Sequence, residues 1–402
     1  MSPDRFAALW RSLLPLGRLG CDGGYLRRSW ARADLECREW FVEEAIDRDL
    51  DVETDRNGNL WAWWGDPNDH GAIVTGSHLD SVPHGGGYDG PLGVVSALLA
   101  VDELRERGVS PRRPIGIVVF TEEEGARFGV ACLGSRLLTG SLDPARARRL
   151  TDHDGITLDE ALETAGLDPK ALGPDPERLA NLGAFVELHI EQGKALVDRG
   201  APVGVASAIW PHGRWRMDFT GEGNHAGTTR MADRHDPMLT FAYAVLVANK
   251  EARLQGAHAT VGRVEAKPNA TNAIPSSIAA WLDARAADAP TLTALVDVIQ
   301  RTVRERSDRD GTGFKLTAES ESPVVEFDTA LRDRLAERLG KAPILPTGAG
   351  HDAGVLAAHV PTAMLFVRNP TGVSHAPAEH ATDLDCALGV TALADTLEEL
   401  AC

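Results

Sequence analysis

Four short apolar segments of this chain each lead into a histidine or a glutamate, and this repeated design constrains the fold most. The segments lie at residues 72–78, 115–120, 184–189 and 362–367. The first ends in His78 and the third in His189, the second runs into the glutamates at 122–124, and the fourth leads through a loop to His375. Helical patterns such as 93–107 lie between them. Strands alternating with helices predict an α/β fold, in which helices cover both faces of a mostly parallel sheet.

In sheets of this kind, ligands bind just beyond the carboxyl ends of the strands. Here those ends and the loops that follow offer histidine, aspartate and glutamate. Nitrogen and oxygen donors without thiolate suit zinc, manganese, cobalt or nickel. Five such groups exceed what one catalytic ion needs, but two ions with a bridging carboxylate use them naturally. In the 122–124 run, consecutive side chains point different ways. One carboxylate can therefore hold a metal while its neighbour accepts a proton from bound water.

The middle of the chain has a different pattern. Residues 214–220 alternate like a half-exposed strand, and a helix is expected from about 236 to 254. Two strands at 260–265 and 277–285 and a helix at 291–306 complete the pattern. This order predicts a smaller α+β domain at 208–320, inserted into a discontinuous larger domain formed by 1–207 and 321–402. The first 60 residues are expected to be helical up to a turn at 57–59.

The net charge of −18, from 41 Lys and Arg against 59 Asp and Glu, argues against nucleic acid and anionic membranes as partners. No apolar run approaches the roughly 20 residues of a membrane helix, and the first residues lack the pattern of a signal peptide. The five cysteines are scattered and form no Cys-x-x-Cys pair, which favours reduced thiols over a disulfide framework or a thiolate zinc site. We therefore expect a cytoplasmic protein. The cysteines are Cys21, Cys37, Cys132, Cys386 and Cys402.

Five longer motifs resemble those of the allantoate amidohydrolases and N-carbamoyl-L-amino acid hydrolases. These enzymes are dinuclear-metal amidases related to the zinc aminoacylases and carboxypeptidases. The motifs are Gly-Ser-His-Leu-Asp-Ser-Val-Pro at 76–83, Glu-Glu-Gly-Ala-Arg-Phe at 123–128, Glu-Leu-His-Ile-Glu-Gln-Gly at 187–193, Asn-His-Ala-Gly-Thr-Thr at 224–229 and Gly-Ala-Gly-His-Asp-Ala at 348–353. The resemblance extends from about residue 35 to 379. It implies a zinc-aminopeptidase-like catalytic domain and an inserted lid domain that also forms the contact of a homodimer.

The resemblance implies two divalent metal ions per subunit, with zinc as the first expectation. It implies that His78, Asp89 and His189 hold one ion. It places Asp89, Glu124 and His375 on the other ion, so that Asp89 bridges the two. By the same resemblance Glu123 is the general base and Asp80 orients His78, while His225 reaches across the dimer to stabilise an oxyanion. The implied contacts to a small anionic substrate are Gln192, His212, Asn272, Arg285, Gly350 and His351.

The implied reaction is hydrolysis of a linear amide or ureido C–N bond in a small substrate that bears a carboxylate. Allantoate is the first expectation, with release of ammonia and CO2 in purine catabolism. Alternatives are an N-carbamoyl-L-amino acid, 3-ureidopropionate, or an N-formyl or N-formimidoyl acidic amino acid. A metallopeptidase or aminoacylase and a non-catalytic binding protein are further alternatives.

The sequence departs from the family in two segments. Residues 211–215 replace the usual Gly-Gln-x-Arg-Tyr, and residues 366–369 replace Phe-Val-Pro-Ser. His212 and Arg368 in these segments either favour a more acidic substrate or are neutral changes.

Overall fold

The computed structural model describes residues 1–402, which form two compact units. The first unit comprises Met1–Ser207 and Glu326–Cys402, and the second comprises Ala208–Val325. The sequence predicts that the second unit ends at residue 320, but the unit continues to Val325. The reason is that strand β12 (Gly313–Ser322) belongs to the sheet of the second unit.

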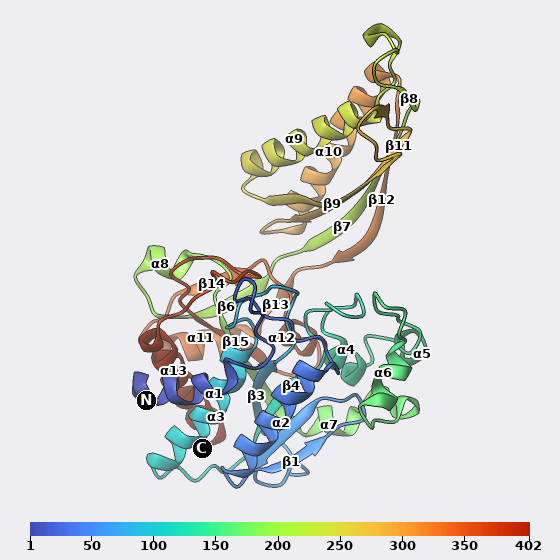
Figure 1. Cartoon of the computed structure of the whole chain (residues 1–402). Helices are drawn as coiled ribbons and strands as arrows, with labels where there is room; N and C mark the ends of the chain where they lie inside the picture. Colours follow the sequence, from blue (N-terminus) through green and yellow to red (C-terminus); the bar gives the residue numbers. More distant parts are fainter. The chain divides into compact units, whose positions relative to one another are not determined.

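A nine-stranded sheet forms the centre of the first unit (Figure 1). Its order is β1-β2-β4-β3-β5-β15-β6-β13, with β14 also paired to β6. The four strands β4, β3, β5 and β15 are parallel, whereas β2 pairs antiparallel to β4 and β6 antiparallel to β15. This confirms the mostly parallel sheet. The bounds are β1 Asp51–Thr54, β2 Leu60–Trp64, β3 Ala72–His78, β4 Ile115–Phe120, β5 Leu182–Ile190, β6 Val203–Ile209, β13 Val325–Glu326, β14 Ile344–Thr347 and β15 Thr362–Val367.

Strands β3, β4 and β15 are buried along their whole length, because helices cover both faces of the sheet. One face packs against α1 (Pro3–Leu13), α2 (Arg32–Ile46), α3 (Pro91–Glu106), α11 (Thr329–Arg338) and α13 (Asp383–Ala401). The other face carries α4 (Leu133–Thr139), α7 (Pro176–Asn181) and α12 (Asp352–Leu356). The remaining short elements are α5 Pro144–Ala147, α6 Leu158–Thr164, η1 Pro169–Ala171 and α8 Ala195–Arg199. None of the helices is long and apolar enough to span a membrane.

The start of the chain differs from the prediction of helices up to residue 60. Helices α1 and α2 are present, but β1 and β2 form an antiparallel pair around the predicted turn. Trp61 and Trp63 lie two residues apart in β2, so they share one face of the strand, and their rings stack at 5.5 Å. The aromatic residues favour a strand here, and a five-residue segment is too short to show that preference as a clear period.

The second unit is an antiparallel sheet of order β12-β7-β11-β9 with two helices on one face. Trp215, Met217 and Phe219 alternate on the buried face of β7 and pack against these helices. The strands and helices predicted for this part of the chain are confirmed, and β12 is an additional strand. The bounds are β7 His212–Thr220, β8 Asn224–His225, η2 Met231–Asp233, α9 Pro237–Gln255, β9 His258–Lys267, β10 Ala273–Ile274, β11 Ser277–Arg285 and α10 Ala289–Asp310.

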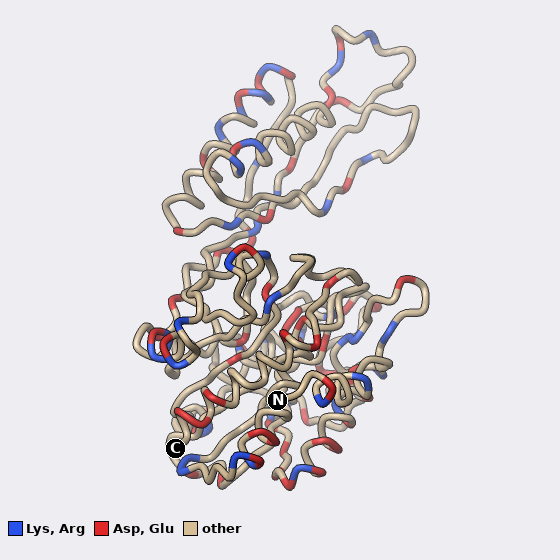
Figure 2. The backbone as a smooth tube through the Cα atoms, turned by 90° about the vertical axis from the view of Figure 1, so that its left-hand side faces the viewer, with Lys and Arg blue, Asp and Glu red and all other residues tan.

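Charged residues of both signs are spread along both units, as Figure 2 shows. The second unit contains 14 Lys and Arg and 14 Asp and Glu, so the net charge of −18 comes from the first unit.

Candidate active site

Asp89 lies in the glycine-rich loop that connects β3 to α3. The loop turns sharply at Gly90, which has a left-handed φ of 87°, and a Cβ at that position would collide with the ring of His78. A carboxylate oxygen of Glu379 accepts hydrogen bonds from the backbone N–H groups of Tyr88 (2.8 Å) and Asp89 (2.9 Å). These contacts fix the loop so that the Asp89 side chain faces the ends of the strands.

The two carboxylate oxygens of Asp89 face two different sets of side chains. Oδ1 lies 3.7 Å from Nε2 of His78 and 3.1 Å from Nε2 of His189. Oδ2 lies 3.2 Å from Nε2 of His375, which in turn lies 3.5 Å from Oε2 of Glu124. The potential ligand atoms of each set lie within 4.8 Å of one another. All five side chains expected to bind metal are therefore brought together, with Asp89 between the two sets.

The hydrogen bonds of the two buried histidines leave their Nε2 atoms directed at this centre. Nδ1 of His78 donates to the backbone carbonyl of Asp80 (3.1 Å), and Nδ1 of His189 donates to that of Ile190 (2.9 Å). Both Nε2 atoms and Oε1 of Glu124 are buried without a hydrogen-bond partner. Buried nitrogen lone pairs and carboxylate oxygens that face one another without a hydrogen-bond partner cost free energy unless a cation lies among them. The residues present therefore fit two divalent metal ions.

The three consecutive glutamates point in three directions. Oε1 of Glu122 accepts the backbone N–H groups of Arg127 (2.8 Å) and Phe128 (2.6 Å), so this side chain shapes the loop. Oε2 of Glu123 lies 3.6 Å from Nε2 of His78, and Glu124 faces His375. Glu122 has a left-handed φ of 55°, which turns the chain sharply after β4. Because the three side chains point in different directions, they can have the different roles that the sequence predicts for them.

The electrostatics of the site indicate a shortage of positive charge. Burial raises the pKa of Glu123 well above its usual range and that of Glu124 to about 7. Burial opposes a charge on His78, but Glu123 and other nearby carboxylates raise its pKa well above the usual value. The hydrogen bond with Asp89 raises the pKa of His375 to about 9. Each raised pKa means that the side chain holds a proton more tightly than usual, in a site that has an excess of carboxylates. Bound divalent cations would supply the positive charge that balances these carboxylates.

Asp80 acts differently from the expectation that its carboxylate orients His78. Its Oδ1 lies 3.6 Å from Nδ1 of His78, beyond a good hydrogen bond, and the backbone carbonyl of Asp80 accepts from that nitrogen instead. The carboxylate accepts the backbone N–H groups of Glu123 and Glu124, each at 3.1 Å. Asp80 thus links β3 to the loop after β4, because its backbone holds His78 while its side chain holds the glutamates.

Three further predicted residues of the first unit have different surroundings. Nε2 of Gln192 donates to Oδ2 of Asp89 (2.8 Å) and to Oγ of Ser374 (2.9 Å), so Gln192 contacts the centre directly. His351 is buried with its ring 4.5 Å from that of His189, and neither of its nitrogens has a hydrogen-bond partner. Burial lowers the pKa of His351 well below the usual value. Gly350 lies in an exposed loop.

In the second unit, His225 and Asn272 lie side by side. Strands β8 and β10 pair His225 with Ala273, and the N–H of Ala226 donates to the carbonyl of Asn272 (3.0 Å). Nδ1 of the His225 ring accepts the backbone N–H groups of Gly227 (3.0 Å) and Thr228 (3.2 Å). In the neutral ring the proton must therefore sit on Nε2, which leaves an exposed N–H donor.

His212 and Arg285 form the other predicted pair of the second unit. They are directly opposite each other in the register of β7 and β11. Nε of Arg285 donates to Asp283 at 2.8 Å and Nη2 to the same carboxylate at 3.1 Å, while Nδ1 of His212 donates to the carbonyl of Trp210 (3.1 Å). Any substrate carboxylate would therefore compete with Asp283 for the guanidinium.

Arg368, which departs from the family pattern, is held by a buried partner. Its Nε and Nη2 donate to the two carboxylate oxygens of Asp385 at 3.1 and 2.7 Å. Because the charge of Arg368 is matched by Asp385, this arginine is better explained as an internal ion pair than as a selector of acidic substrates.

Several side chains that support the site were not predicted from the sequence. Glu379 and Ser374 contact the loop or the side chain of Asp89. Glu187 accepts from Oγ of Ser77 (2.8 Å) and from the N–H of Ala353 (3.0 Å), which joins β3 and α12 to β5. Each of these residues lies within a few positions of a predicted ligand, and this proximity is the one signal that could have pointed to them.

Comparisons with known proteins agree with this geometry. Residues 74–399 match the model of peptidase family M20/M25/M40. The chain is 38% identical to an N-carbamoyl-L-amino acid amidohydrolase of Geobacillus stearothermophilus and 32% identical to an allantoate amidohydrolase of Escherichia coli K12, with 98% of each chain covered. A crystal structure of AtUAH in complex with (S)-hydroxyglycine has a TM-score of 0.87 and 28% identity, covering 100% of this chain and 98% of that one.

The fold and these relatives define a hydrolase that acts on C–N bonds other than peptide bonds. The chain belongs to peptidase family M20/M25/M40, whose members depend on a dinuclear metal centre. The resemblance to allantoate amidohydrolases and N-carbamoyl-L-amino acid hydrolases is thereby confirmed at the level of the family.

Proposed function

We propose that this protein hydrolyses a ureido C–N bond in a small carboxylate-bearing substrate, with allantoate as the first candidate. The observation that carries the proposal is the position of Asp89, whose two oxygens face two separate sets of nitrogen and oxygen donors. Such a centre holds two ions around a bridging carboxylate, and bound divalent ions polarise a carbonyl and make water more acidic. An N-carbamoyl-L-amino acid is the second candidate, favoured by the relative with 38% identity.

Glu123 is proposed as the residue that moves the proton. Its buried carboxylate faces Nε2 of His78 and is not needed in either ligand set. A buried carboxylate with a raised pKa is a competent base and, once protonated, a competent acid. Glu123 accepts a proton from the attacking water and delivers it to the leaving nitrogen.

Three side chains of the second unit are proposed to bind the substrate. The N–H at Nε2 of His225 donates to the carbonyl oxygen, which becomes negative as water attacks. Arg285 offers a planar guanidinium that suits a substrate carboxylate, and Asn272 adds an amide donor. Glu123 would move the proton, while Arg285 and Asn272 position the substrate and His225 stabilises the developing negative charge.

The length of β11 supports a dimer in which two subunits share each site. Arg285 ends this nine-residue strand, whereas His225 and Asn272 lie beyond its other end at Ser277. A strand of this length spans about 26 Å. A small substrate cannot contact both ends of one strand. Each site is therefore proposed to take Arg285 from one subunit and His225 from the other.

An apolar strip on the second unit is proposed as the dimer contact. Leu239, Leu246 and Leu254 lie along one side of α9 and are 50%, 68% and 69% exposed. Val264 is 45% exposed on β9, which is an edge strand of the four-stranded sheet in this unit. A long edge strand with nearby apolar side chains is suited to pair with a second copy of itself.

A substrate panel tests the proposed reaction. Protein loaded with zinc, manganese, cobalt or nickel is incubated with allantoate, an N-carbamoyl-L-amino acid, ureidoglycolate, 3-ureidopropionate, N-formyl-L-glutamate and a dipeptide, and ammonia and free amine are followed. We expect ammonia release from allantoate, or from the N-carbamoyl acid if the second candidate is correct. An analogue in which the carboxylate is replaced by a carboxamide serves as the matched control and should turn over poorly. Cleavage of the dipeptide alone would overturn the proposal.

A further inference from the structure

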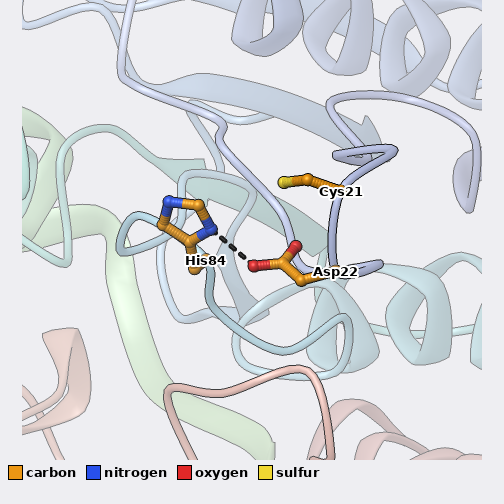
Figure 3. A group of neighbouring side chains, drawn as sticks. All are labelled: Cys21, Asp22 and His84. Carbon is orange, nitrogen blue, oxygen red and sulfur yellow. Dashed lines mark hydrogen bonds and ion pairs between the residues drawn. The ribbon is translucent and has the colours of Figure 1, made fainter.

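A second cluster of metal-binding side chains lies on the surface of the first unit. Cys21, Asp22 and His84 place a thiol, a carboxylate and an imidazole with all three potential ligand atoms within 4.8 Å of one another (Figure 3). All three residues are exposed, and Cys21 is a free cysteine. None of them contributes to the two ligand sets around Asp89.

The backbone holds the two segments of this cluster in register. The N–H of Tyr25 donates to the carbonyl of Gly85 (3.1 Å), which bridges the segments. Gly24 is packed so closely that a Cβ would meet the backbone of His84 at 2.9 Å. Oδ1 of Asp22 accepts the N–H of Gly24 (3.0 Å), so the carboxylate is fixed with Oδ2 directed at Nδ1 of His84, 2.6 Å away. The backbone thus brings the carboxylate and the imidazole together beside Cys21 before any ion binds.

From this arrangement we propose that Cys21, Asp22 and His84 form a surface site for a thiophilic divalent cation such as zinc. Thiolate, carboxylate and imidazole are the donors that zinc prefers, and water fills the fourth position. Zinc ligands of one tetrahedron lie farther apart than the 2.6 Å between Asp22 and His84. The ion therefore takes the place of the hydrogen between these two atoms: the proton leaves Nδ1 of His84 for solvent, and a neutral ring then carries its proton on Nε2. The thiol proton is likewise released to solvent as the metal–sulfur bond forms.

The sequence could not indicate this site because Cys21 and His84 are far apart in the chain and no Cys-x-x-Cys pair is present. The ion would tie the segment at 21–22 to the loop that follows β3 and carries Asp89. Its expected effect is a higher melting temperature of the first unit, separate from catalysis.

Cobalt titration of the holoenzyme tests the proposal. A cobalt–thiolate bond gives a charge-transfer absorption in the near ultraviolet, and the five ligands proposed for the dinuclear centre contain no sulfur. With that centre already filled, we expect the wild-type protein to bind about one further equivalent of cobalt with this absorption. The variants Cys21→Ser and His84→Gln should lose the absorption and retain their activity.

The matched control is Cys402→Ser, since Cys402 is the other exposed cysteine and lies outside the cluster. This variant should keep the absorption. A second readout is the rate at which a thiol reagent modifies Cys21, which zinc should slow by about tenfold or more. The proposal is overturned if the absorption is missing in the wild type, survives in Cys21→Ser or disappears in Cys402→Ser, or if zinc leaves the rate unchanged.

Discussion

At the scale of single residues, adjacent glutamates differ in role because their side chains reach different partners. Glu122 binds backbone amides, Glu123 approaches His78 and Glu124 approaches His375. A substitution in this run should therefore change either the shape of the loop, the proton transfer or the metal affinity, according to its position.

The Glu123→Gln variant removes the proposed proton carrier and keeps its size. We expect kcat to fall on the order of 10²- to 10⁴-fold, because an amide cannot accept the proton. Metal content, measured by mass spectrometry of the purified protein, should stay at the wild-type level, since Glu123 is not needed in either ligand set. A kcat within about threefold of the wild type would contradict the role assigned to Glu123.

Asp34 gives the protein a pH-dependent stability. Burial raises the pKa of this carboxyl to about 6, against 3.8 for an ordinary aspartate. Between these values the folded protein binds a proton that the unfolded chain lacks. The contribution of Asp34 to stability therefore falls as the pH rises from 3.8 to about 6, by about 3 kcal/mol at most, and is constant at higher pH.

The Asp34→Asn variant mimics the protonated form at every pH and keeps an acceptor for the N–H of Trp30. Measured by urea unfolding, its stability relative to the wild type should improve between pH 4.5 and pH 7.5. The exposed Asp69 provides the control, and Asp69→Asn should show no such trend. An Asp34→Asn difference that is equal at both pH values would refute the explanation.

Histidine and glutamate at or beyond the strand ends were visible in the sequence, whereas the choice of Asp89 and the division of the ligands between two ions came from the resemblance to the family. The contacts of the Asp80 carboxylate and the part played by Glu379 were not predictable, since both carboxylates bind backbone amides. Any nearby carboxylate can accept such a bond, so no residue type or spacing marks the one that does. The pairing of Arg285 with Asp283 likewise depends on the rotamers of two half-buried strand residues.

At the scale of elements, Glu379 joins two loops. It follows β15 and the His375 loop, and it accepts the amides of the loop between β3 and α3. In the Glu379→Ala variant these amides lose their acceptor, and the loop that carries Asp89 loosens. We expect metal affinity, measured by competition with a chelator, to fall about 10- to 100-fold.

Glu379→Gln is the matched variant, because its amide oxygen can still accept both hydrogen bonds. Its metal affinity should stay within a few-fold of the wild type. Wild-type affinity in Glu379→Ala would show that the loop holds its shape without this contact.

The elements were predictable wherever burial imposes a pattern. Strands β3, β4, β5 and β15 are nearly continuous apolar runs because both faces of the sheet are covered. Strand β12 lies at the edge of its sheet and is mostly exposed, and its apolar alternation is confined to Phe314, Leu316 and Ala318 near its start. The pairing that defines β12 comes from β7, a partner distant in the chain.

At the scale of the whole molecule, the proposed sharing of sites predicts complementation. His225→Ala and Arg285→Ala homodimers should each be nearly inactive. A mixed dimer of the two variants contains one site with both groups intact and one site with neither. Co-expressed with two affinity tags and purified through both, the mixed dimer should recover about half of the wild-type kcat.

Recovery requires that the two residues reach one site from different chains. A mixed dimer as inactive as its parents would show that both groups of each site come from the same chain. A Leu246→Glu variant gives an independent check, because a charge on the apolar strip of α9 should yield monomers by light scattering, with a matching loss of turnover.

Strand β11 has a consequence for how this protein can vary. Each pair of residues added to or removed from a strand moves its end by about 7 Å while keeping every side chain on its own face. Such a change would leave the second unit folded and alter the distance between Arg285 and His225 at the two ends of the strand. On this proposal, natural variants of the chain can exchange the half-buried side chains of β11 other than Asp283 and Arg285. They cannot change its number of residues without a compensating shift in how the two subunits meet.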